Sequence, residues 1–71
     1  MRREYHVRLR AMNFSVEGYG PSKAASKLSS WVECVPGTII EVEGLQGGWL
    51  RYQVGRRPRM IVALGRVRRA S

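Results

Sequence analysis

Residues 20–37 read GPSKAASKLSSWVECVPG, and this stretch has the spacing of a helix with one apolar side. Pro21 suits the first helical position, because the missing N–H costs no hydrogen bond there. Pro36 and Gly37 then end the pattern. The sequence therefore predicts a helix over residues 21–35. The apolar stripe of this helix consists of Ala24, Ala25, Leu28, Trp31, Val32 and Val35.

Strand patterns lie on both sides of the predicted helix. Before it, Tyr5, Val7 and Leu9 alternate with polar residues, which indicates a half-buried first strand that continues to about Val16. After the helix, Gly-rich and basic turns at 44–48 and 55–58 separate three further strand-like runs, at residues 38–43, 49–54 and 59–67.

The predicted order of elements is β-α-β-β-β. Consecutive hairpins make the last three strands antiparallel, and the sheet is the one partner available to the apolar side of the helix. We therefore expect an α+β fold in which one helix packs on one face of an antiparallel β-sheet and the other face stays open. A chain of 71 residues forms a single domain. We expect it to be monomeric, with residues 66–71 fraying as a basic tail.

The charge of the chain is strongly positive and unevenly distributed. Thirteen Lys and Arg residues, eleven of them Arg, face five Glu residues, for a formal net charge of +8. Residues 1–10 carry +3, residues 11–43 carry −2 and residues 44–71 carry +7. Such a chain is typical of proteins that meet a polyanion. A solvated tail is the plainer explanation, but the planar fork of Arg favours binding of phosphate or carboxylate groups.

Few residues of this chain suit catalysis. His6 is the only histidine and is expected to be a surface side chain, since acid–base catalysis needs a positioned partner. Cys34 is the only cysteine, so we expect a small buried hydrophobe and a reducing compartment. Glu41 and Glu43 point to one side of a strand, where ordinary solvent-facing carboxylates explain them better than a paired acidic site. We expect no enzyme activity, cofactor or metal. We also expect no targeting segment and no membrane span.

The candidate site lies on the open face of the sheet. Alternation places Leu50, Tyr52 and Val54 inward, so Trp49 and Arg51 are expected to face away from the helix. An exposed Trp among Arg side chains is typical of base stacking or of a protein-binding hot spot; the alternative is that Trp49 covers a sheet edge. The residues expected to bind a partner are Arg8, Arg10, Lys23, Lys27, Trp49, Arg51, Arg56, Arg57 and Arg59.

Two motifs carry a resemblance to a known family. The segment CVPGTIIEVE (34–43), followed by GGWLRY (47–52), resembles the small β-α-β-β-β type I anti-CRISPR proteins of bacteriophages. Those proteins share a Cys-x-x-Gly-Thr turn after the helix, a Glu that closes the second strand and a Gly-x-Trp-Leu-x-Tyr start to the third. The resemblance covers about half of the chain, and the Arg-rich C-terminal strand departs from it.

The resemblance implies an inhibitor without catalytic activity, acting in the cytoplasm of an infected bacterial host. It would bind the backbone subunits of the type I Cascade complex with its crRNA, block pairing of the target DNA, and promote non-specific binding of double-stranded DNA. A protein of charge +8 does not imitate DNA, so it would use Arg contacts and an aromatic anchor. The alternative is a small basic DNA- or RNA-binding protein that acts directly through its Arg-rich sheet face.

Overall fold

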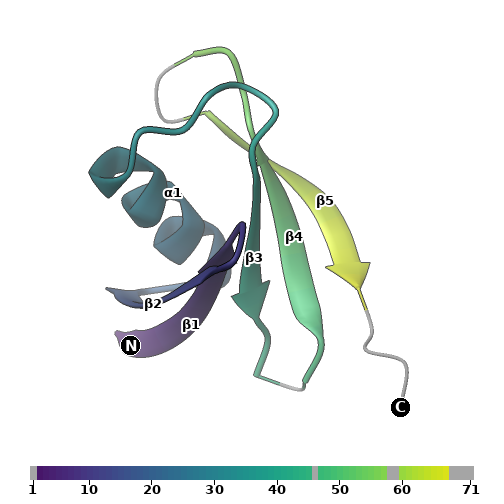
Figure 1. Cartoon of the computed structure of the whole chain (residues 1–71). Helices are drawn as coiled ribbons and strands as arrows, with labels where there is room; N and C mark the ends of the chain where they lie inside the picture. Colours follow the sequence, from purple (N-terminus) through teal and green to yellow (C-terminus); the bar gives the residue numbers. More distant parts are fainter. Residues whose placement is uncertain (1, 46, 58–59, 68–71) are drawn as a thin grey trace.

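Within residues 2–45, 47–57 and 60–67, which the computed structural model describes, five strands form one antiparallel sheet and one helix crosses its face (Figure 1). This confirms the predicted α+β class with a helix packed on one side of the sheet. In chain order the elements are β1 (Arg3–Leu9), β2 (Met12–Gly18), α1 (Pro21–Trp31), β3 (Ile39–Glu43), β4 (Trp49–Val54) and β5 (Ile61–Val67).

The predicted first strand is a hairpin of two strands, so the order is β-β-α-β-β-β. β1 pairs with β2, and Leu9 lies opposite Met12 across a turn at Arg10 and Ala11. Arg10 has a φ of 57°, in the left-handed region that glycine or asparagine usually occupies. The turn was missed because neither residue marks it. The sequence does hold a signal, since the apolar positions change from odd numbers before Leu9 to even numbers after Met12.

The strands lie in the sheet in the order β2-β1-β3-β4-β5. Both β2 and β3 run antiparallel to β1 and therefore parallel to each other, and α1 connects them across β1. β3 and β4 separate β1 from β5 (Figure 1). Arg8 of β1 and Arg66 of β5 therefore do not lie on neighbouring strands.

The helix ends at Trp31, four residues before the predicted end at Val35. Val32 has an extended backbone, and its N–H donates to the Leu28 carbonyl at 3.0 Å. β-branched side chains favour this change to extended backbone. The predicted stripe was wrong at Trp31 and Val35, whose side chains are exposed.

The core lies between the helix and the sheet. Alternate residues of the strands point toward α1, and each strand from β1 to β4 contributes at least one fully or nearly fully buried side chain. Cys34 packs against the margin of this core but is only partly buried, not buried as predicted. The buried cluster consists of Tyr5, Val7, Leu9, Val16, Ala24, Ala25, Leu28, Ile40, Val42, Tyr52 and Val54.

The last strand starts later than predicted but ends at Val67, as predicted for the run 59–67. β5 begins at Ile61 rather than at residue 59, and Arg66 and Val67 are its final residues rather than part of a tail. Its pairing with β4 shifts register next to Arg51, where Leu64 is the extra residue. Residues 68–71, the rest of the predicted tail, lie outside the described residues.

Candidate functional site

One carboxylate organises the centre of the open sheet face. The register places Glu41 of β3 between Arg8 of β1 and Arg51 of β4. Arg8 donates from Nε and Nη2 to Glu41 Oε1 at 3.1 and 3.0 Å. Arg51 donates from Nε and Nη2 to Glu41 Oε2 at 3.4 and 3.2 Å. The two guanidinium groups therefore share one carboxylate, and the cluster has a net charge of +1.

The environment of Glu41 keeps it ionised. Its side chain is 16% exposed, and this burial by itself raises the pKa of the carboxyl group. Hydrogen bonds from Arg8 and Arg51, together with their positive charges, outweigh the burial, so the pKa of Glu41 lies below its ordinary value. Glu41 is thus a permanent partner for both cations at neutral pH, in contrast to the solvent-facing carboxylate that was expected.

Trp49 lies on the predicted face but is covered. The Arg8 guanidinium carbon lies 4.3 Å from the centroid of the Trp49 ring, within the range of a cation–π interaction. Trp49 is only 9% exposed, so the expectation of an exposed Trp was wrong. Alternation determines the face to which a side chain points, but it does not show what packs over that side chain.

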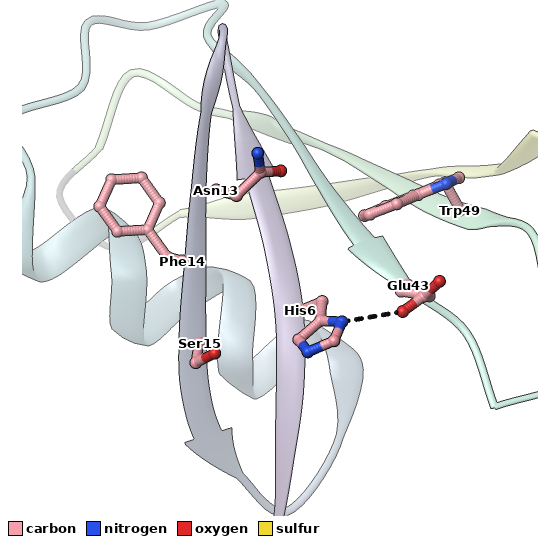
Figure 2. A pocket seen from close by; sticks show the side chains of 6 residues that line it. All are labelled: His6, Asn13, Phe14, Ser15, Glu43 and Trp49. Carbon is pink, nitrogen blue, oxygen red and sulfur yellow. Dashed lines mark hydrogen bonds and ion pairs between the residues drawn. The ribbon is translucent and has the colours of Figure 1, made fainter.

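A hollow of about 380 Å³ lies beside this cluster, between the β1–β2 hairpin and Trp49. His6 Nδ1 lies 3.1 Å from Glu43 Oε1, and Figure 2 shows these two side chains pointing toward each other. Both side chains are about half exposed or more, so His6 is a surface residue, as expected. A polar contact so open to water contributes little to stability.

Two further hollows adjoin each other on the helix side, because both include Ser30. One of about 350 Å³ is lined by Lys23, Ser26, Lys27 and Ser30. The other, of about 390 Å³, lies between the end of α1 and the β4–β5 connection. The second hollow is lined by Ser29, Ser30, Cys34, Pro36, Val54, Gly55, Arg56 and Arg57. None of the described residues that line either hollow is acidic.

The predicted site residues therefore divide between two surfaces. Arg8, Trp49 and Arg51 form the sheet-face cluster, and Arg10 joins Arg8 and Arg51 around a hollow of about 370 Å³ at its border. The other four described residues form what we call the helix-side basic surface: Lys23, Lys27, Arg56 and Arg57. The predicted contact residue Arg59 lies outside the described residues.

Sequence reasoning missed the role of Glu41 and the serines beside the helix-side cations. The β3–β4 register places Glu41 opposite Arg51 and could have revealed that pair, because the intervening hairpin is short. The pairing of β1 with β3 joins residues more than thirty positions apart, and no local pattern of the sequence encodes it.

The motif residues behind the anti-CRISPR resemblance have folding roles here. Gly37 has a φ of +94°, and its N–H donates to the Val54 carbonyl at 2.8 Å. Thr38 Oγ1 donates to the Val35 carbonyl at 2.7 Å. Trp49 and Tyr52 are both buried. Folding alone accounts for these residues, so they do not by themselves point to a partner.

No family model, curated protein or solved structure matches this chain. The resemblance to anti-CRISPR proteins therefore stays a prediction. α1, with 11 residues, is the one helix among the described residues, and it lacks the length and apolar character needed to cross a membrane.

Proposed function

We propose that this protein binds nucleic acid, without catalysis, through the helix-side basic surface. One observation carries the proposal: Lys23, Lys27, Arg56 and Arg57 line two adjoining hollows to which the described residues contribute no carboxylate. Phosphate groups bind where cations gather without competing anions, because their binding releases counterions from the nucleic acid.

The neighbouring hydroxyl groups add shape rather than donors. Ser29 Oγ donates to the Ser26 carbonyl, and Ser30 Oγ donates to the Lys27 carbonyl, each at 2.7 Å. Their protons are therefore engaged within the helix. The ammonium and guanidinium groups would supply the phosphate contacts, which predicts binding with a steep dependence on salt.

The sheet face suits phosphates less well. Glu41 engages both Arg8 and Arg51, and Glu43 stands on the same face beside His6. A phosphate placed there would meet two carboxylates and would have to compete for cations already in short ion pairs. For this reason we assign the nucleic acid to the helix side rather than to the Arg-rich sheet face.

A mobility-shift titration at several salt concentrations tests this proposal. If four cations contact phosphates, the logarithm of the binding constant for duplex DNA should fall with the logarithm of the salt concentration, with a slope of about −3 to −4. Replacing Arg56 and Arg57 by Gln should make that slope shallower by about 2. The matched control is R10Q/R66Q, which removes the same charge from two exposed positions elsewhere. Equal losses in both double variants would refute the assignment to the helix side.

A second candidate function is inhibition of the crRNA-guided Cascade complex, as the resemblance implies. The observation that favours it is the nearly charge-balanced sheet face, where Trp49 lies among Arg8, Glu41 and Arg51. Such a mixture suits a protein surface better than a polyanion. Pull-down against assembled type I Cascade complexes tests this candidate. Capture that survives R56Q/R57Q but is lost in Arg51→Ala would support it, whereas no capture by any complex would exclude it.

A further inference from the structure

Four side chains of the helix side form a regular row. Tyr19, Lys23, Lys27 and Trp31 occur at intervals of four residues, and residues four apart are neighbours on a helix surface. The two outer members are aromatic and the two inner members are cationic. The row begins just before α1 and ends at its last residue, so it runs the length of the helix.

Both aromatic rings are open to solvent. Tyr19 is 64% exposed and Trp31 is 58% exposed, whereas Trp49 is 9% exposed. Folding does not account for Tyr19 and Trp31, because neither belongs to the core. Exposed aromatic rings at a polar surface are typical of recognition sites.

Each ring has a lysine beside it. Lys23 Nζ lies 5.9 Å from the centroid of Tyr19, and Lys27 Nζ lies 5.4 Å from the centroid of Trp31. Lys27 Nζ also donates to the Glu17 carbonyl of β2 at 3.2 Å, which ties the ammonium group to the end of that strand. A planar ring and a positive charge therefore stand next to each other at both ends of the row.

The same lysines line the hollow of about 350 Å³, so the row belongs to the helix-side basic surface. A nucleic acid seated on that surface would place its phosphates near Lys23 and Lys27 and its bases near the two rings. In a duplex the base faces are stacked on one another and are closed to such rings. In a single strand they are open, and every base offers a face on which an aromatic ring can stack.

We propose that the nucleic acid bound by the helix-side basic surface is single-stranded, with unpaired bases stacking on Trp31 and Tyr19. This inference rests on the proposed function and specifies its ligand. Since α1 has 11 residues and is roughly 16 Å long, the strand would have to cover several nucleotides to reach both rings. The surface would distinguish unpaired from paired nucleic acid and would not distinguish one base sequence from another.

The experiment uses the intrinsic fluorescence of the two tryptophans. Trp31 is exposed and Trp49 is covered by Arg8, so stacking should quench mainly Trp31. The probes are oligo(dT) and oligo(U) of about 12 nucleotides, a length within the usual site sizes, and a DNA hairpin duplex with the same number of phosphates. We expect both single strands to quench the wild-type protein and to bind more tightly than the duplex.

Variants assign the effect to the rings. Trp31→Ala and Tyr19→Ala should each weaken single-strand binding by roughly 5- to 150-fold, while duplex binding stays unchanged. Trp31→Phe should restore most of the affinity, because it keeps a stacking surface. Leu45→Ala is the control, since Leu45 is equally exposed but lies far from the row in sequence. Circular dichroism verifies the fold of each variant, and Tyr19→Ala carries the test if Trp31→Ala does not fold.

The outcomes separate the inference from the proposed function. Equal affinity for single strand and duplex, with Trp31→Ala silent, would overturn the single-strand inference and leave nucleic-acid binding in place. Absence of binding to any probe at low salt would overturn both. If the two rings bind a protein partner instead, the single-strand affinity of Trp31→Ala should equal that of the wild type. That result would also count against the inference.

Discussion

At the scale of single residues, Glu41 is the side chain on which the sheet face depends. It accepts hydrogen bonds from Arg8 and Arg51, and its removal would leave two guanidinium groups side by side. We expect Glu41→Gln to lower the free energy of unfolding by about 1–2 kcal/mol at neutral pH, because the ion pairs are partly exposed.

The ionisation of Glu41 also predicts how the stability of the protein depends on pH. The pKa of Glu41 is lower in the folded protein than its ordinary value. Its contribution to stability is therefore complete above the ordinary pKa of a Glu carboxyl, and it is lost as pH falls through the lower, folded value. Urea unfolding from pH 7 down to pH 3 should show a smaller acid loss in Glu41→Gln than in the wild type. Glu33→Gln, at an exposed position, is the control and should lose stability in acid like the wild type. An identical acid loss in the wild type, Glu41→Gln and Glu33→Gln would contradict the role assigned to Glu41.

Replacing Trp49 or Trp31 by Ala should have different effects on stability, because the two rings differ in burial. Trp49→Ala removes a ring that is 9% exposed and lies under Arg8, and should cost about 3 kcal/mol. Trp31→Ala removes a ring that is 58% exposed and should change stability by at most about 0.5 kcal/mol. Chemical denaturation of the two variants measures both values. Similar costs would mean that the burial of the two rings has been assigned wrongly.

At the scale of elements, the packing of α1 depends on fewer residues than its sequence suggests. Leu28 is fully buried between α1 and the sheet, so Leu28→Ala should cost about 2–5 kcal/mol. Val35 belongs to the same predicted stripe but is 61% exposed after the helix has ended. Val35→Ala is therefore expected to melt like the wild type. A large loss in Val35→Ala would indicate that the helix continues beyond Trp31 in solution.

At the scale of the whole molecule, the net charge of +8 sets the balance between repulsion and pairing. Repulsion among like charges opposes the compact state and is screened by salt, whereas exposed ion pairs contribute little. We therefore expect the melting temperature to rise when NaCl is increased from about 10 to about 150 mM, a range over which the Debye length falls from roughly 30 to 8 Å. A falling melting temperature would show that the ion pairs around Glu41 outweigh the repulsion.

The sequence by itself determined the class of the fold and the face of most strand residues. A period of two in Leu50, Tyr52 and Val54 places them toward the helix, and the structure buries Tyr52 and Val54 and half-buries Leu50. The turn at Pro36 and Gly37 and the bounds of β4 also follow from local residue chemistry. Such features depend on backbone preferences and on periodicity, which neighbouring residues express without help from the rest of the chain.

Only the tertiary structure decided which charged residues are engaged and which rings are covered. Arg8 reaches Glu41 and Trp49 because β1 pairs with β3, a contact between residues more than thirty positions apart. Alternation gives the direction of a side chain, but ion pairing and burial depend on what lies opposite, and the strand order supplies that neighbour.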